Sequence, residues 1–231
     1  MQMARLTYFK ERGRAETTRW TLAATGVAFT NVAVETASEL DELRRANVLP
    51  FDQMPLLEID GRCLSQSSAM IRYLARRGGL YGADPTEAMW CDMIAGAAAD
   101  FAETAIQAPF KPDAPTAIAD LQQRFAKFGP RFEARIAAQG SGFTAAATLT
   151  FADVVLCEAL SSYLEWCPDI LQDTPHLRRL YQTVTDLPGI AAYLASDLRY
   201  PKPGDAYVIA AARVLRRALP PHMPDPDRFV G

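Results

Sequence analysis

Two side chains near the amino end of the chain could together act on a sulfur atom. Tyr8 ends a short run typical of a strand, and Arg14 lies where the next helix is expected to begin. A phenol at this place could donate a hydrogen bond to the sulfur of a ligand, and donation to the charged form favours thiolate over thiol. The positive charge of Arg14 would add to this effect. The ordinary alternative is that Tyr8 packs half-buried at a strand end and that Arg14 belongs to a turn.

A second candidate site surrounds Met54 and Pro55, just before a run typical of a strand. A proline that leads into a strand needs no partner for its missing N–H. If the bond before Pro55 is cis, the backbone of Met54 faces outward as an unpaired edge that a peptide ligand can join. Gln66 and Ser67 open the next helix, where free N–H groups attract a carboxylate in addition to ordinary capping. An edge for a peptide and a pocket for its carboxylate belong together.

The elements that must position these residues alternate up to about residue 80. Strands are predicted at 5–8, 28–34, 56–59 and 62–64, and helices at 15–25, 38–46 and 67–77. Asp60-Gly61 predicts a tight hairpin between the last two strands, because this dipeptide accepts positive φ readily. The order βαβαββα indicates a small mixed sheet covered by helices.

Every pattern after residue 84 is helical. Asp84-Pro85-Thr86-Glu87 predicts a helix start, and Thr150-Phe151-Ala152-Asp153 predicts a capping box. Helices are expected at 84–110, 116–138, 150–165, 174–185, 188–196 and 205–219. We therefore expect an α/β domain over residues 1–80 and an all-helical domain over residues 85–231.

Composition argues against several classes of protein. The 231 residues carry 24 basic and 27 acidic side chains, and the basic pairs are scattered, so nucleic-acid binding is not indicated. We expect no secretory signal and no membrane span, because no sufficiently long apolar run is present. Four separated cysteines and two histidines predict no metal site and reduced thiols in a cytoplasmic protein, with Cys167 the most exposed.

Several motifs in one order resemble those of a known family. They are LTYF at 6–9, RGRAE at 12–16, QMPLLEIDG at 53–61, QSSAMIRYL at 66–74, TFAD at 150–153 and DLPGI at 186–190. Together they resemble cytosolic glutathione S-transferases of the tyrosine type, between the alpha and sigma classes. The resemblance covers nearly the whole chain. It implies a thioredoxin-like first domain and a homodimer that uses reduced glutathione as cosubstrate without a metal.

The resemblance also implies roles for individual residues. Tyr8 matches the catalytic tyrosine, and Arg14 matches an arginine that lies near the thiolate in some alpha-class enzymes. The backbone of Met54 would pair with the cysteinyl part of glutathione, and Gln66 and Ser67 would hold its γ-glutamyl carboxylate. The implied glutathione-binding set is Arg44, Gln53, Met54, Pro55, Gln66, Ser67 and Asp100.

Three of the implied roles concern the glycine end of glutathione and the partner subunit. Arg44 would meet the glycine carboxylate, although its neighbour Arg45 could be the matching residue. Asp100 would reach the γ-glutamyl amine of glutathione in the other subunit, and otherwise it is a solvated helix carboxylate. Phe51 would be an aromatic key inserted into the partner, and otherwise it packs on its own domain.

An apolar electrophile would bind between the two domains. The residues expected to form its pocket are Phe9, Lys10, Ile106, Gln107, Phe110 and Tyr207. Gln107 and Lys10 depart from the all-apolar alpha pattern. The tail after Lys202-Pro203 is longer than in typical alpha enzymes, which leaves its behaviour as a lid open.

The leading interpretation is a transferase in which Tyr8 stabilises the glutathione thiolate for attack on an electrophilic carbon. The same thiolate would also serve isomerisation, peroxide reduction or ether-bond cleavage, and the sequence does not separate these. A non-catalytic dimeric module is disfavoured because Tyr8, Gln66, Ser67 and Asp100 occur together. A dithiol oxidoreductase is disfavoured because Cys63 lies away from the first strand–helix turn.

Overall fold

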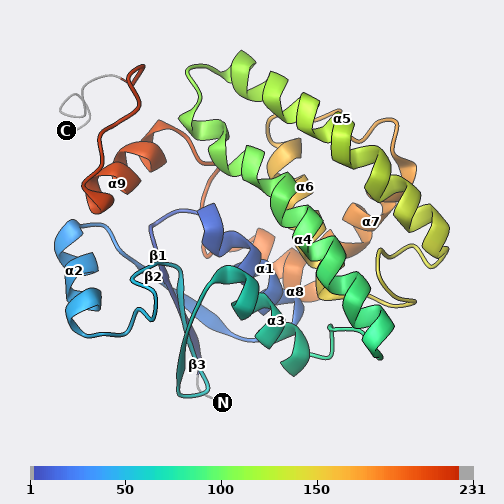
Figure 1. Ribbon diagram of the computed structural model, residues 1–231, viewed down its shortest axis with the longest axis horizontal. Helices are drawn as coiled ribbons and strands as arrows, with labels where there is room; N and C mark the ends of the chain where they lie inside the picture. The colour runs from blue at the N-terminus through green and yellow to red at the C-terminus, as the bar shows by residue number, and fades with distance from the viewer. Residues whose placement is uncertain (1–2, 224–231) are drawn as a thin grey trace.

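The first part of the chain folds around a four-stranded mixed sheet, as the sequence predicted. The computed structural model describes residues 3–223 (Figure 1). The strands are β1 (Ala4–Tyr8), β2 (Phe29–Ala33), β3 (Leu56–Ile59) and β4 (Arg62–Ser65), arranged in the order β2-β1-β3-β4. β2 runs parallel to β1, while β3 is antiparallel to both β1 and β4.

Strand register brings the predicted site residues to one end of this sheet. Leu56 of β3 pairs with Thr7 of β1 and with Ser65 of β4. The residues next to these pairs are Tyr8, Pro55 and Gln66. The bond between Met54 and Pro55 is cis, as expected. Backbone pairing alone therefore brings Tyr8 and Gln66, nearly 60 positions apart in the sequence, to the same end of the sheet.

Short helices surround the sheet. They are the 3₁₀ turn η1 (Gly13–Ala15), α1 (Glu16–Ala24), α2 (Ala37–Arg45) and α3 (Ser67–Arg77). α2 begins with a capping box, in which the Thr36 hydroxyl accepts from the Glu39 N–H and the Glu39 carboxylate accepts from the Thr36 N–H. α1 packs against α3 on one side and α6 on the other, so it joins the sheet to the helical part.

The second part of the chain is helical throughout its described length. Its elements are α4 (Pro85–Gln107), the 3₁₀ turn η2 (Ala108–Phe110), α5 (Ala114–Gln139), α6 (Phe151–Leu164), α7 (Pro175–Thr185), α8 (Pro188–Leu194) and α9 (Asp205–Leu215). The two long helices α4 and α5 lie side by side, and α9 lies next to α2 (Figure 1). The predicted helix over 205–219 ends early, because Arg216 adopts a left-handed conformation with φ 50°.

Both predicted helix starts are present. The Asp84 carboxylate accepts from the N–H groups of Thr86 and Glu87, with Pro85 as the first helical residue. The buried Asp153 carboxylate accepts four hydrogen bonds of 2.7–2.9 Å from the N–H and hydroxyl groups of Thr144 and Thr150. This network anchors the start of α6, whose residues are almost all buried.

The cysteine expectation was wrong in one respect. All four cysteines are free, but Cys167 is only 8% exposed, whereas Cys63 on β4 is the exposed one. β4 is an edge strand, while the turn after α6 folds back under α5, so Cys167 is covered. Within residues 3–223, no helix is both long and apolar enough to cross a bilayer, and no cluster of His, Cys, Asp and Glu is placed to hold a metal.

Candidate active site

Tyr8 lies buried at the end of β1 with its hydroxyl against the following turn. Its side chain and backbone together are 5% exposed, and its oxygen accepts the Arg14 N–H at 3.3 Å. Gly13 makes this approach possible, because a Cβ there would lie 2.7 Å from the Tyr8 oxygen. Gly13 also has φ +40°, a conformation that side chains disfavour. Glycine at the centre of the RGR sequence therefore lets the backbone contact the Tyr8 phenol.

The Tyr8 phenol keeps its proton at neutral pH. Burial raises the pKa of Tyr8, while the Arg14 N–H, the Tyr207 hydroxyl and the charges of Arg14 and Arg19 lower it, with burial dominant. Burial, followed by the neighbouring Tyr8 phenol, also raises the pKa of Tyr207, so both phenols are protonated at neutral pH. A neutral phenol that accepts from the Arg14 N–H still has its own O–H to donate. This geometry suits a donor to an anionic sulfur.

Glu11 is a functional candidate that the sequence analysis missed. One of its carboxylate oxygens is buried without a hydrogen-bond partner in the described structure. Burial raises the pKa of Glu11 to about 6, against the charges of Arg12 and Arg19. Its charge also contributes to the raised pKa of Tyr207. An acidic residue in the turn between Tyr8 and Arg14 was the available signal, but the sequence does not show that the turn buries it.

The peptide edge and the start of α3 lie beside each other. Gln66 has φ 67° and donates from its side-chain amide to the Gln53 side chain at 3.0 Å. Ser67 is the first residue of α3, and no side chain caps this helix. The first N–H groups of α3 are therefore not satisfied by a capping side chain, which is the condition for binding a ligand carboxylate.

Three predicted residues lie farther out. Arg44 on α2 donates to Asp52 at 2.6 Å and to Asp41 at 3.3 Å. Asp100 lies exposed on α4, where its backbone oxygen accepts from the Arg124 guanidinium. The Phe51 side chain is exposed, with 65% of its surface open. These positions leave each of them available to a ligand or a partner.

A cavity of about 430 Å³ opens next to Tyr8. Five of the six predicted electrophile-pocket residues line it, namely Phe9, Ile106, Gln107, Phe110 and Tyr207. Tyr8 and Arg14 line it too, so the sulfur donor and the pocket share one space. Lys10 is not among the lining residues, and its ammonium lies 3.8 Å from the Glu35 carboxylate.

The carboxyl-terminal part of the chain contributes lining residues beyond Tyr207. They are Val208, Ala211, Ala212, Leu215, Arg217, Ala218, Leu219 and Pro220. The apolar residues at 207–208, 211–212 and 215 recur at helical spacing, which was the signal for one inward-facing stripe. At its end, α9 is attached to α2 by Arg216, which donates to Asp41 at 2.5 and 3.2 Å.

Comparison with known proteins places this geometry in a family. The family model for the glutathione S-transferase N-terminal domain matches residues 4–76, and the model for the C-terminal domain matches residues 99–197. Rat glutathione S-transferase alpha-4 is 35% identical over 92% of this chain and 97% of the relative. Human glutathione S-transferase A1 is 32% identical, also over 92% of this chain and 97% of the relative.

Solved structures agree with the sequence comparison. The glutathione S-transferase from Ascaris lumbricoides superposes with a TM-score of 0.75 at 30% identity, covering 87% of this chain and all of the other. Monomeric Na-GST-3 from the hookworm Necator americanus gives the same TM-score at 26% identity, covering 86% of this chain and 99% of the other. The chain belongs to the cytosolic glutathione S-transferase family.

Proposed function

We propose that the protein conjugates glutathione to apolar electrophiles and that Tyr8 carries the chemistry. The observation on which this rests is the buried phenol that opens onto the 430 Å³ cavity and retains its own proton. A thiol that releases its proton to water beside this phenol becomes a thiolate that accepts a hydrogen bond from Tyr8. The thiolate then forms a bond to an electrophilic carbon, and the displaced electron pair leaves with the leaving group or passes into a conjugated acceptor.

Arg14 would stabilise the same thiolate electrostatically. Its backbone N–H already holds the Tyr8 oxygen, and its guanidinium lies at the rim of the cavity. Positive charge close to a sulfur favours the anion, and both reactants held in one cavity gain from proximity. No step requires a metal.

Glutathione would bind along the end of the sheet. The backbone of Met54 would pair with the cysteinyl part, while Gln53, Gln66 and Ser67 would hold the γ-glutamyl end. Met54 directly precedes Pro55, which leads into β3. The Arg44 guanidinium would release the Asp52 carboxylate and bind the glycine carboxylate of glutathione in its place.

The electrophile would occupy the cavity between the helical part and the turn after β1. Phe9, Ile106, Phe110 and Tyr207 supply apolar and aromatic surface, and Gln107 supplies an amide at the rim. The Lys10 ammonium would have to leave the Glu35 carboxylate to reach the substrate.

Members of this family are commonly dimers, and one structural neighbour is described as monomeric. We propose a homodimer in which Phe51 inserts into the partner and Asp100 reaches the glutathione of the other subunit. Support comes from the exposure of Phe51, together with exposed Met89 and Met93 on α4. An exposed phenylalanine loses water-accessible apolar area when a partner covers it.

We also propose two domains, 1–80 and 85–231, and a cytoplasmic location. The linker falls between the end of α3 at Arg77 and the start of α4 at Pro85. Residues 224–231 of the proposed second domain lie outside the described residues. The four free cysteines fit a reducing compartment.

Replacing Tyr8 by phenylalanine tests the proposal directly. The ultraviolet absorbance of bound glutathione thiolate, followed against pH, should show an apparent thiol pKa higher by about two units, or roughly 2.7 kcal/mol. The matched control is Tyr181→Phe on α7, which should leave the thiol pKa unchanged. Equal thiol pKa values in wild type and Tyr8→Phe would remove Tyr8 from the mechanism.

A further inference from the structure

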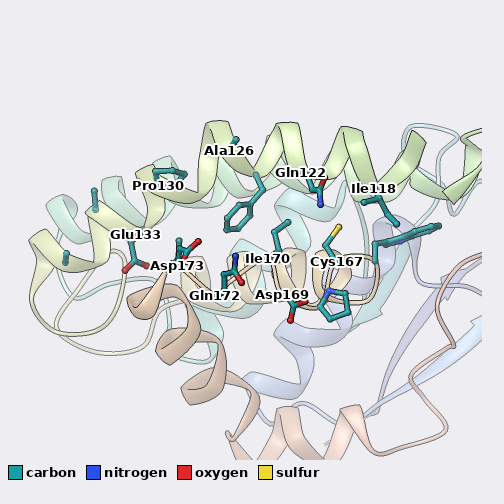
Figure 2. Close-up of a pocket in the computed structure, with 16 residues that line it drawn as sticks. Ile118, Gln122, Ala126, Pro130, Glu133, Cys167, Asp169, Ile170, Gln172 and Asp173 are labelled. Carbon is teal, nitrogen blue, oxygen red and sulfur yellow. The ribbon is translucent and has the colours of Figure 1, made fainter. Parts of the chain in front are cut away.

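A second and larger cavity lies away from the active site. It is a groove of about 750 Å³ between α5 and residues 166–174, the segment that joins α6 to α7 (Figure 2). None of the residues assigned above to glutathione or to the electrophile lines it. Its volume is in the range of cavities that take small organic ligands.

Apolar side chains line both walls of the groove. Ile118, Phe125 and Pro130 face it from α5, and Trp166, Cys167 and Ile170 face them from the opposite wall. The Cys167 sulfur points toward α5 (Figure 2). Burial raises the pKa of Cys167, so its thiol is neutral and behaves as apolar surface. Transfer of the apolar body of a ligand from water to this surface would therefore be favourable.

The charged side chains along the groove all have the same sign. They are Glu133, Asp169 and Asp173, and no lysine, arginine or histidine among residues 3–223 belongs to the lining, although the Lys202 ammonium lies 3.5 Å from the ring centre of Trp166. Both Glu133 oxygens accept backbone N–H groups at the start of α7, from His176 at 2.9 Å and Leu177 at 2.8 Å. Asp169 and Asp173 form no salt bridge with any described residue.

Two of the three carboxylates, those of Glu133 and Asp173, lie at one end of the groove. Asp173 lies at the same end as Glu133, whereas the carboxylate of Asp169 points away from α5 (Figure 2). Glu133 is already engaged by N–H groups at the start of α7, whereas the Asp173 carboxylate, next to the same helix start, forms no hydrogen bond or salt bridge with a described side chain or backbone group. This end of the groove would favour a cation and repel an anion.

The uncharged polar side chains of the lining favour neither sign of charge. They are Gln122, Gln172 and Thr174, whose amide and hydroxyl groups can both donate and accept hydrogen bonds. The preference of the groove for a ligand that donates therefore comes from its carboxylates.

We propose that the groove binds a small apolar molecule carrying a protonated amine. The apolar body lies against Phe125, Ile170 and Cys167, and the ammonium group lies near Asp173. The assignment is independent of the transferase activity, because no active-site residue takes part. An apolar carboxylate of the same size would be excluded by charge.

A matched pair of probes tests the charge preference. Isothermal titration calorimetry would compare 4-phenylbutylammonium with 4-phenylbutyrate on the full-length protein, with S-hexylglutathione added to occupy the active site. We expect the ammonium to bind at least tenfold more tightly than the carboxylate. Equal binding of the two probes, or no ammonium binding up to several millimolar, would overturn the proposal.

Two substitutions, each with a matched control, test the location. Ala126→Trp fills the groove from α5 and should abolish ammonium binding, whereas the exposed Ala138→Trp, outside the lining, should not. Asp173→Asn should weaken binding about two- to fivefold, since exposed ion pairs contribute up to about 1 kcal/mol. The exposed Asp197→Asn is its control. If Ala126→Trp and Ala138→Trp bind the ammonium equally, the probe occupies another place and the assignment is wrong.

Discussion

The guanidinium of Arg14 donates two hydrogen bonds to the Glu103 carboxylate, at 2.9 and 3.1 Å. The contact joins the turn after β1 to α4, and Arg14 also lines the electrophile cavity. The N–H of the same arginine holds the Tyr8 oxygen at 3.3 Å. Arg14 therefore connects the phenol, by its backbone, to the helical part of the protein, by its side chain.

Arg14→Ala separates these two roles, because the backbone N–H remains. We expect the apparent pKa of bound glutathione to rise and kcat/KM to fall about tenfold, since one cation near the thiolate is lost. Glu103→Gln should have the opposite and smaller effect on the thiol pKa, because it removes a neighbouring negative charge. Thiolate absorbance against pH measures both. A fall in activity with no change in thiol pKa would contradict the electrostatic role.

Glu11→Gln should shift the pH dependence of activity. With a pKa of about 6, Glu11 is mostly ionised at pH 7, and its charge opposes negative charge on the Tyr8–Tyr207 pair. Removing it should lower the apparent pKa of bound glutathione, so kcat/KM at pH 6–7 rises relative to wild type. Arg12 and Arg19 offset part of that charge, so we expect a shift below one unit. Glu42→Gln, on the exposed face of α2, is the control. A shift toward higher pH would instead identify Glu11 as a proton acceptor.

Glu158 should make folding stability depend on pH. It lies 7% exposed on α6, accepts the Thr17 hydroxyl at 2.8 Å, and has a pKa raised to about 7 by burial and by Glu16. Because the folded state holds a proton that the unfolded chain releases near pH 4.5, stability falls as pH rises from about 4.5 to 7. Glu158→Gln should therefore gain stability over wild type by roughly 1–3 kcal/mol at pH 8, and much less at pH 5.

Denaturant unfolding at the two pH values checks the Glu158 prediction. Glu42→Gln, on the exposed face of α2, provides a control that should show no pH-dependent difference. If Glu158→Gln differs from wild type by the same amount at pH 5 and pH 8, the carboxyl group does not titrate on unfolding in this range.

Phe51→Ser should weaken self-association. The ring is 65% exposed in the single chain, and the serine removes the apolar surface that a partner would cover. Sedimentation velocity at a series of concentrations should show monomer at concentrations where wild type is dimeric. Met3→Ser, which removes another exposed apolar side chain, is the matched control. A monomeric wild type, or unchanged association in Phe51→Ser, would remove Phe51 from the interface.

Much of the fold could be predicted from the sequence because its signals are local. The Asp84 and Thr150 helix starts, the Asp60-Gly61 hairpin and the alternation before residue 80 each depend on side chains within a few positions of one another. Tyr8, Met54-Pro55 and Gln66-Ser67 were found the same way. They lie at strand ends and at a helix start, and strand pairing then brings them to one end of the sheet.

Tertiary packing determined those features of the protein that no local sequence pattern encodes. Burial of Cys167 under α5, the distance of Lys10 from the cavity and the early end of α9 at Arg216 all depend on elements remote in sequence. The same holds for the proton on Glu158, whose pKa reflects desolvation by α1 and the neighbouring charge of Glu16. Desolvation and shape arise only when distant segments meet, so residue type and spacing alone could not determine them.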